Sequence, residues 1–242
     1  MIDVEHLSIG FGETVILEDL SFSVQRGEIF VILGGSGSGK TSLLKCMIDL
    51  LQPLAGTIRI EGVEKTGLNG GPPSYGVLFQ SGALLGSMTL LENVRLPLEK
   101  WTPLDNTAID AIARSKLRLV GLEGFEAYLP AEISGGMKKR AGIARALALE
   151  SPLLFLDEPS AGLDPVTAVE LDDLILTLNS SLGMTMVIVT HELESIFKIS
   201  RRCIMLDRDA RGIIARGDPR ELREQASDPR ALNFFNRISP GA

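Results

Sequence analysis

The sequence predicts an α/β fold in which buried, mainly parallel strands form a sheet and a helical segment is inserted into it. Continuous apolar runs recur along the chain, and such runs suit parallel strands covered by helices on both faces. Between residues 82 and 151 these runs disappear and helical patterns take over. With 242 residues, 45% of them hydrophobic, the chain is long enough to bury a full core.

Two kinds of strand are expected. Leu20–Val24 and Thr57–Ile60 alternate apolar and polar residues, which is the pattern of half-exposed strands. The fully apolar runs predict buried strands at Ile29–Leu33, Val77–Phe79, Leu153–Leu156, Met186–Val189 and Ile204–Leu206.

Most of the buried runs lead directly into a residue that can contact a ligand. Gly34, Gln80, Asp157 and the pair Thr190-His191 each follow one of them. Open α/β sheets bind their ligands at the carboxyl ends of the strands. We therefore expect these residues to gather at one edge of the sheet.

Helix starts are marked by capping signals. Thr89–Glu92 has the spacing of a capping box, and Asp164-Pro165 is an N-cap followed by proline at the first helical position. A further helix is predicted over Thr41–Leu51, directly after a glycine-rich loop.

Composition narrows the function classes. The net charge of −7 and the pI near 5.0 argue against a nucleic-acid carrier, which usually shows a basic stripe. The acidic start lacks the pattern of a signal peptide, and no apolar run approaches the roughly 18 residues of a membrane span. Cys46 and Cys203 lie in apolar segments and are expected to be reduced and buried.

The segment Gly34–Thr41 matches the phosphate-binding pattern G-x-x-x-x-G-K-[ST]. Glycines let backbone N–H groups turn toward phosphate oxygens, and the following helix directs its positive end at them. Lys40 would neutralise the β- and γ-phosphates, and the Thr41 hydroxyl would bind Mg²⁺. The alternative is a glycine-rich turn without a ligand.

The acidic pair after Leu153–Leu156 fits a second nucleotide motif. Asp157, at the strand end, can hold Mg²⁺ through its water shell. Glu158 then lies one residue closer to the γ-phosphate, where its carboxylate could act as a general base on the attacking water. The alternative is an ordinary acidic turn after a buried strand.

A second glycine-rich helix start lies at Ile133–Met137. Ser134 before two glycines can form an anion site from backbone N–H groups and the helix dipole. A plain N-capped helix explains the same local pattern. Lys138–Arg140 predict a solvated face of that helix, with assistance to phosphate binding as the alternative.

Taken together, these motifs resemble those of ATP-binding cassette ATPases. Gly34–Thr41 resembles Walker A, Leu153–Glu158 resembles Walker B, and Ile133–Met137 is similar to the LSGGQ signature. Gln80 falls at the Q-loop, Ser160–Asp164 at the D-loop and His191 at the switch histidine, in the family's order, and the resemblance runs from about residue 2 to about residue 225.

The resemblance implies a single nucleotide-binding domain over residues 1–242 with three parts. Residues 1–81 and 152–217 would form a P-loop NTPase (RecA-like) core with an N-terminal antiparallel β subdomain. Residues 82–151 would form the inserted α-helical signature lobe, and 218–242 a C-terminal tail.

The resemblance also implies roles for individual residues in hydrolysis of Mg-ATP at a homodimer interface. Phe11 would stack on adenine, Gln80 would contact Mg²⁺ or the attacking water, and His191 would hydrogen-bond the γ-phosphate. The catalytic residues implied are Glu158, His191, Lys40 and Gln80; the metal ligands are Thr41, Gln80 and, through water, Asp157; ATP would be bound by Phe11, Gly34, Gly35, Ser36, Gly37, Ser38, Gly39, Lys40, Thr41 and Ser42, and ATP of the partner protomer by Ser134, Gly135 and Gly136.

The signature departs from the family at two positions. Ile133 stands where leucine is usual, and Met137 where glutamine is usual. The serine and both glycines, which carry the phosphate contact, are retained. The change at Met137 therefore puts the rate or the lobe packing in question, and not the activity.

A narrower resemblance, to the ATPases of Mla-type lipid transporters, rests on fewer residues. They are Phe79–Leu85, the Ser-Gly-Gly-Met form of the signature, Asp228–Arg230 and Phe234-Phe235. It implies lipid (phospholipid) transport across the cell envelope, with the ATPase bound peripherally at the cytoplasmic face of the inner membrane. The implied partners are an MlaE-like membrane permease, a small STAS-like accessory subunit and an MCE-type substrate-binding protein, with no nucleic acid.

Other readings stay open at this point. The chain could serve an importer for a small polar solute, because the residues of the catalytic site are the same. A soluble ATP-driven clamp on ribosomes or DNA fits the acidic charge of the chain less well. A scaffold that does not hydrolyse ATP fits the motifs less well. The apolar tail segment Ala231–Phe235 either packs on its own core or reaches a second protomer or accessory subunit.

Overall fold

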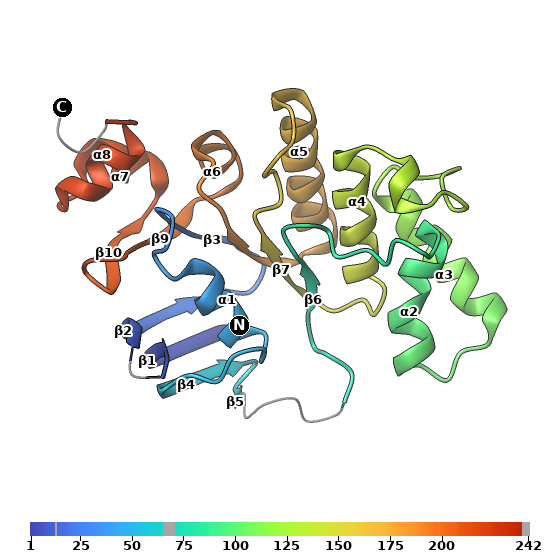
Figure 1. Ribbon diagram of the computed structural model, residues 1–242, viewed down its shortest axis with the longest axis horizontal. Coiled ribbons are helices and arrows are strands. Elements are labelled where there is room, and N and C mark those ends of the chain that lie inside the picture. Colours follow the sequence, from blue (N-terminus) through green and yellow to red (C-terminus); the bar gives the residue numbers. More distant parts are fainter. Residues whose placement is uncertain (13, 65–70, 239–242) are drawn as a thin grey trace. The chain divides into compact units, whose positions relative to one another are not determined.

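The computed structural model describes residues 1–12, 14–64 and 71–238. The chain divides into two compact units, one formed by Met1–Asn69 with Thr185–Ala242 and the other by Gly70–Met184. Figure 1 labels the elements of both units.

The first unit contains an antiparallel sheet built from the amino-terminal strands. Its order is β2-β1-β4-β5, with β1 at Ile2–Phe11, β2 at Thr14–Val24, β4 at Ala55–Ile60 and β5 at Val63–Glu64. Both alternating segments expected from the sequence lie inside these strands, within β2 and β4.

The same unit contains a set of parallel strands in the order β9-β3-β8. They are β3 at Ile29–Gly34, β8 at Thr185–Val189 and β9 at Arg202–Asp207, and β10 at Gly212–Gly217 pairs with β9 in the antiparallel direction. Every residue of β3 and β8 is buried, as the apolar runs predict. The helices of this unit are α1 at Lys40–Met47, α6 at Leu193–Ile199, α7 at Pro219–Gln225 and α8 at Pro229–Phe235.

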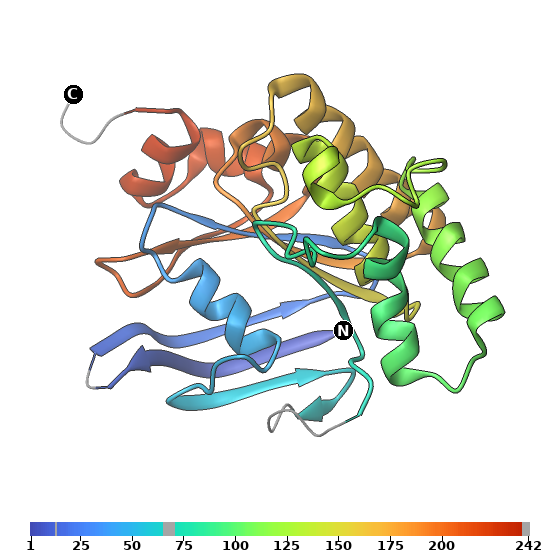
Figure 2. The ribbon, with the colours of Figure 1, turned by 45° about the vertical axis from the view of Figure 1, so that its right-hand side comes forward.

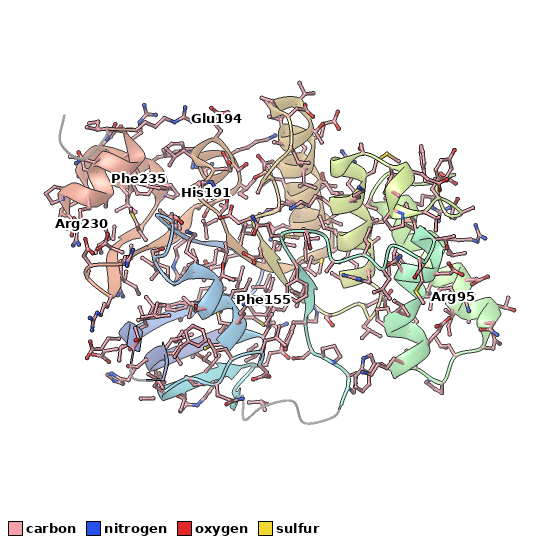
Figure 3. The ribbon with its side chains drawn as sticks, in the orientation of Figure 1. Arg95, Phe155, His191, Glu194, Arg230 and Phe235 are labelled. Atoms are coloured by element: carbon pink, nitrogen blue, oxygen red, sulfur yellow. The ribbon has the colours of Figure 1, made fainter. Side chains whose placement is uncertain are left out.

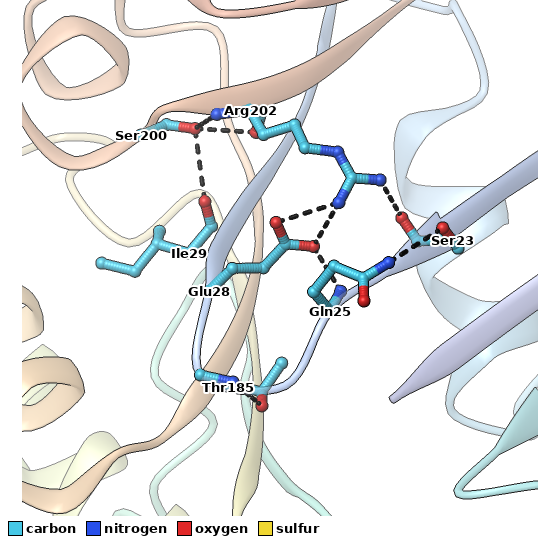
Figure 4. A network of polar contacts seen from close by, with 8 residues as sticks. Ser23, Gln25, Glu28, Ile29, Thr185, Ser200 and Arg202 are labelled. Carbon is cyan, nitrogen blue, oxygen red and sulfur yellow. Dashed lines mark hydrogen bonds and ion pairs between the residues drawn. The ribbon is translucent and has the colours of Figure 1, made fainter.

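A polar network joins the ends of three strands of the first unit (Figure 4). The Arg202 guanidinium donates to both carboxylate oxygens of Glu28, at 3.0 and 3.1 Å, and to the carbonyl of Ser23 at 2.6 Å. The Ser200 hydroxyl donates to the carbonyls of Ile29 and Arg202. These bonds fix the start of β3, the strand that leads into the glycine-rich loop.

Helix α1 is shorter than the sequence predicts. The expected helix over Thr41–Leu51 ends at Met47. Asp49 has a left-handed backbone with φ of 59°, and the amides of Leu50 and Leu51 both turn back to the carbonyl of Lys45. This left-handed closure stops the helix one turn before its apolar pattern ends.

In its described residues, 71–184, the second unit has two parallel strands and four α-helices. Strand β6 at Gly76–Leu78 pairs with β7 at Leu153–Asp157. The helices are α2 at Leu90–Trp101, α3 at Asn106–Leu119, α4 at Gly135–Ala146 and α5 at Pro165–Leu182, with a 3-10 turn at Pro130–Glu132. Helices α2, α3 and α4 pack against one another, and α4 also contacts α5 (Figure 2).

The predicted helix starts of this unit are confirmed. The Thr89 hydroxyl accepts from the Glu92 amide while the Glu92 carboxylate accepts from the Thr89 amide, which is a complete capping box. The Asp164 carboxylate accepts from the amides of Val166 and Thr167 at the start of α5.

The cysteines match the expectation from the sequence, and the tail shows the first of its two alternatives. Cys46 and Cys203 are free and buried, and burial raises the pKa of both thiols to about 12. Phe235 of α8 is buried, with its ring centroid 6.1 Å from that of Phe197 on α6 (Figure 3). The segment Ala231–Phe235 therefore packs within its own unit, whereas residues 239–242 lie outside the described part. Over that described part, no helix combines the length and the apolar character needed to cross a bilayer.

Candidate nucleotide site

The glycine-rich loop of the first unit connects β3 to α1 and folds around its own lysine. Lys40 is only 9% exposed, and its ammonium group donates to the carbonyls of Gly34, at 2.7 Å, and Gly35, at 3.0 Å. The buried strand before the loop and the helix after it are the context that the phosphate-binding motif requires.

A second polar group in this loop fits an anion. Ser38 is 2% exposed, and its Oγ has no hydrogen-bond partner among the described residues. Buried hydroxyl groups are nearly always hydrogen-bonded, so a phosphate oxygen is the partner that would satisfy it. Thr41 is exposed on the first turn of α1, and its hydroxyl is the oxygen type that Mg²⁺ prefers.

A cavity near this loop is lined by the strand-pairing partner of Phe11. Phe11, at the end of β1, is 54% exposed and pairs with Thr14 across the hairpin. Thr14 lines a cavity of about 490 Å³ together with Gly37 of the loop. The other residues that line the cavity are Val15, Ile16, Arg208, Asp209 and Arg211. The arginines were missed at the sequence level, and nothing in their local pattern marks them.

His191 lies at the same edge of the parallel strands as the loop. Ile32 of β3 is opposite Val189 of β8, so Gly34 and His191 each follow two residues after this pair. The His191 side chain is 54% exposed, and its Nε2 lies 3.7 Å from a carboxylate oxygen of Glu192 (Figure 3). Within the first unit, the structure therefore brings the phosphate-loop start and the predicted switch histidine together.

The second unit holds the acidic pair at the end of β7. Asp157 is 6% exposed and Glu158 is 8% exposed. Glu158 has a left-handed backbone with φ of 47°, a conformation that residues other than glycine adopt at functional sites more often than elsewhere. Its carbonyl accepts from the Ala161 amide at 3.2 Å.

Gln80 lies next to this acidic pair in the second unit. Leu78 of β6 is opposite Leu156 of β7, so Gln80 and Glu158 each follow two residues after this pair. Gln80 is exposed, and a hydrogen bond from the Gly82 amide to the Phe79 carbonyl, at 2.7 Å, turns the chain around it.

The expected solvated face at Lys138–Arg140 is wrong for Lys139. That residue is only 5% exposed, and its ammonium group donates to the carbonyl of Gln80, at 2.5 Å, and to the carbonyl of Glu158, at 2.9 Å. Desolvation lowers the pKa of Lys139, while the carboxylates of Asp157 and Glu158 act in the opposite direction. Its position on the helix, three residues after buried Gly136, puts it on the inner face.

The signature segment begins α4 as a capped helix. The Ser134 hydroxyl accepts from the Met137 amide at 3.2 Å. Ser134 and Gly135 are exposed, whereas Gly136 is buried against Thr167 of α5. The helix has 12 residues, so its N-terminus offers exposed amides and a positive dipole end. The cap is compatible with a plain N-capped helix and also with an anion site, because an anion would use the remaining amides.

The comparisons with known proteins agree with these motifs. A family model described as "ABC transporter" matches residues 17–161. The "Probable ribonucleotide transport ATP-binding protein mkl" of Mycobacterium leprae is 40% identical over 246 residues, which cover 99% of this chain and 70% of that protein. The "Intermembrane phospholipid transport system ATP-binding protein MlaF" of Haemophilus influenzae is 36% identical over 246 residues, covering 100% of this chain and 92% of that protein.

Two solved structures are also similar. The dimeric ATP-binding cassette MJ0796, in a post-hydrolysis state bound to ADP and Pi, has a TM-score of 0.80 and 29% identity, and the match covers 90% of this chain and 98% of that one. The structure of cbiO1 from Clostridium perfringens has a TM-score of 0.83 and 27% identity, with 98% of this chain and 96% of that one covered. The chain therefore belongs to the ABC transporter family and, with the ABC ATPase fold that its motifs predict, is the ATP-hydrolysing subunit of such a transporter.

Proposed function

We propose that Glu158 is the general base for hydrolysis of ATP bound at the glycine-rich loop. The observation that carries this proposal is the buried acidic pair that directly follows β7, with Glu158 held in a left-handed backbone conformation. The carboxylate would accept a proton from water as that water attacks the γ-phosphate in line. His191 would hydrogen-bond the γ-phosphate and help to position Glu158.

The nucleotide would be held by the residues that the motif predicts. The Lys40 ammonium already lies within the loop, and it would exchange its carbonyl partners for phosphate oxygens. The loop amides of residues 34–39 and the hydroxyls of Ser38, Thr41 and Ser42 would complete the cradle, and Phe11 would cover the adenine. Bound Mg²⁺ would supply charge neutralisation at the phosphates, with Thr41, Gln80 and Asp157 as the residues that hold it.

We propose further that two copies of the chain complete the site. Ser134 and Gly135 are exposed at the start of α4, where an anion from another molecule can reach the amides. The similar cassette MJ0796 is dimeric in the structure with ADP and Pi. Ser134, Gly135 and Gly136 would bind the γ-phosphate of ATP held by the partner protomer. In this scheme residues 82–151 act as the signature lobe, and 1–81 with 152–217 as the core.

The Glu158→Gln substitution tests the catalytic assignment. It removes the base but keeps the size and hydrogen-bonding capacity of the side chain, so ATP binding should be retained. The steady-state rate should fall by about 10²–10⁴-fold, the range for loss of a general base. Turnover would be measured by phosphate release and ATP affinity by fluorescence titration. Wild-type turnover in this variant would refute the assignment.

The proposed cargo is a lipid. The observation that favours it is the 36% identity to MlaF proteins over the full length of this chain, as in Escherichia coli K12, where 90% of that protein is covered. Exposed Leu85, together with a cavity of about 220 Å³ lined by Phe79 and Pro97, offers apolar surface next to Gln80 for a helix of a membrane permease. The complex would include an MlaE-like permease at the cytoplasmic face of the inner membrane, with STAS-like and MCE-type partners as further candidates.

A second candidate cargo is a small polar solute. The mkl proteins, at 40% identity, carry a name that assigns them to ribonucleotide transport. Purification of the chain with its permease from native membrane would separate the two candidates. Co-purified phospholipid, and ATPase activity stimulated by phospholipid in the reconstituted complex, would support the lipid. Stimulation by ribonucleotides without bound lipid would support the polar solute.

A further inference from the structure

Side chains on one face of helix α4 donate hydrogen bonds to the segment that follows β6. Lys139 donates to the carbonyl of Gln80, and Arg145 donates to the carbonyls of Gly82, at 3.1 Å, and Ala83, at 2.7 Å. Between them on this face, a Cβ on Gly142 would lie 2.6 Å from Leu78 and 3.2 Å from the Gly82 carbonyl. One buried cation, Lys139, one half-buried cation, Arg145, and one close backbone approach thus hold the Q-loop segment against the helix.

Lys139 differs from Arg145 because it also hydrogen-bonds a second loop, the one that follows β7. The same ammonium group that holds the Gln80 carbonyl also donates to the Glu158 carbonyl at 2.9 Å. A lysine ammonium has three donors and no acceptor, so one group can bridge two carbonyls from different loops. The hydrogen bonds of the Arg145 guanidinium described above go to residues 82 and 83, and neither of them goes to the acidic pair.

The hydrogen bond from Lys139 can stabilise the unusual backbone conformation of Glu158. Its φ of 47° is unfavourable for a residue with a Cβ, and such a conformation persists where the surrounding structure fixes it. A charge-assisted bond to a carbonyl is stronger than a neutral one, and at 5% exposure it is little weakened by water. The direction of the Glu158 Cα–Cβ bond follows from its backbone, so a bond that holds its carbonyl also fixes where the side chain begins.

We propose that Lys139 is a positioning residue that couples the signature helix and the Q-loop to the catalytic glutamate of the same chain. Its ammonium group joins α4, the Gln80 carbonyl and the Glu158 carbonyl in one rigid connection. A displacement of Gln80 or of α4 is thereby transmitted to Glu158. The proposal rests on Glu158 as the base, as argued above.

The main test is the Lys139→Met substitution, which keeps the length of the side chain and removes its donors. ATP affinity should change less than about threefold, because the hydrogen bonds of Lys139 hold the backbone of Gln80 and Glu158 and the substitution leaves the loop at Gly34–Thr41 unchanged. The rate constant kcat should fall by about 10–100-fold, the range expected when a catalytic group is misplaced by about 1 Å. Lys139→Arg, which keeps the charge and several donors, should restore most of this loss.

Two matched variants separate positioning from loss of stability. Arg145→Met removes the other cation that holds the segment after β6, a half-buried one, so it should lower the melting temperature but reduce kcat less than about threefold. Lys116→Met removes an ion pair with Glu150, at 2.8 Å, elsewhere in the same unit and should leave kcat unchanged. Should Lys139→Met fail to fold, Lys139→Gln takes its place, since its amide can still donate to one carbonyl.

A double-mutant cycle then shows whether Lys139 acts through Glu158. In the Glu158→Gln background, Lys139→Met should reduce the residual rate by less than about threefold, because the group that it positions is already disabled. Wild-type kcat in Lys139→Met, an equal loss in Arg145→Met, or fully additive losses in the cycle would each overturn the proposal. The base assignment is tested separately, since it fails only if Glu158→Gln alone retains turnover.

Discussion

At the scale of single residues, the side chains that bear chemistry are those whose burial or backbone sets them apart. Lys40, Lys139 and Glu158 are all less than 10% exposed, although lysine and glutamate are residue types that are seldom fully buried. The ammonium groups of both lysines donate hydrogen bonds to backbone carbonyls. Charged groups of this kind hold loops in place, which is what a site for a highly charged nucleotide requires.

The signature glycines predict a difference between two neighbouring substitutions. A Cβ on Gly136 would lie 2.3 Å from the Thr167 methyl group, whereas a Cβ on Gly135 would lie 3.4 Å from Leu163. Thr167 cannot rotate away freely, because its hydroxyl donates to Asp164 at 2.6 Å. We expect Gly136→Ala to destabilise the second unit by about 1–3 kcal/mol, as overpacking usually does.

Two neighbouring positions, Gly135 and Thr167, supply matched control substitutions for this prediction. Gly135→Ala should change the melting temperature little, since its added methyl group makes an ordinary contact. Thr167→Ser removes the opposing methyl group and keeps the hydroxyl, so the Gly136→Ala/Thr167→Ser pair should recover most of the lost melting temperature. A pair that melts as low as Gly136→Ala alone would show that the clash is not the cause.

At the scale of elements, the sequence predicts what is local and misses what depends on packing. The caps at Thr89, Ser134 and Asp164 follow from short patterns and are confirmed. The apolar runs that predict buried strands are confirmed as well, except that the run at Val77–Phe79 forms a strand only to Leu78, with Val77 half-buried. The end of α1 depends on a left-handed residue at Asp49 that no nearby glycine announces. The burial of Lys139 depends on two loops, at Gln80 and Glu158, that are far from it in the sequence. The basic run Lys138–Arg140 therefore does not reveal from the sequence alone that Lys139 is buried.

The cap of α5 makes stability depend on pH in a defined direction. The hydroxyl of Thr167, and then its amide, hold the pKa of Asp164 below its ordinary value. A carboxylate with a lowered folded-state pKa adds stability that is fully present above the unfolded pKa, about 3.9, and is lost as pH falls through the folded value. The melting temperature of Asp164→Ala should therefore lie below that of wild type at pH 7.

The two melting curves should converge as the pH is lowered below about 4, because protonated Asp164 no longer accepts as a carboxylate. Differential scanning calorimetry of both proteins between pH 7 and pH 2.5 measures the gap. A gap that stays constant over this range would mean that the ionised cap contributes nothing to the stability of α5.

At the scale of the whole molecule, the motifs divide between the two units. Lys40, His191 and Phe11 belong to the first, and Gln80, Glu158 and the signature to the second. The family relationship shows that these parts form an ATP-hydrolysing transport subunit. Beyond this family relationship, we propose that the signature segment of each copy, starting at Ser134, binds the ATP held by its partner. A single copy would then bind ATP but hydrolyse it poorly.

The most direct test of this claim is the molar mass of the Glu158→Gln variant by sedimentation velocity. With Mg-ATP it should sediment as two chains of 26.1 kDa, and with ADP as one. Addition of Ser134→Arg, which fills the anion site with a positive side chain, should return the ATP-bound protein to a single chain. A Glu158→Gln protein saturated with ATP that remains at the mass of one chain, or a dimer indifferent to Ser134→Arg, would contradict the shared site.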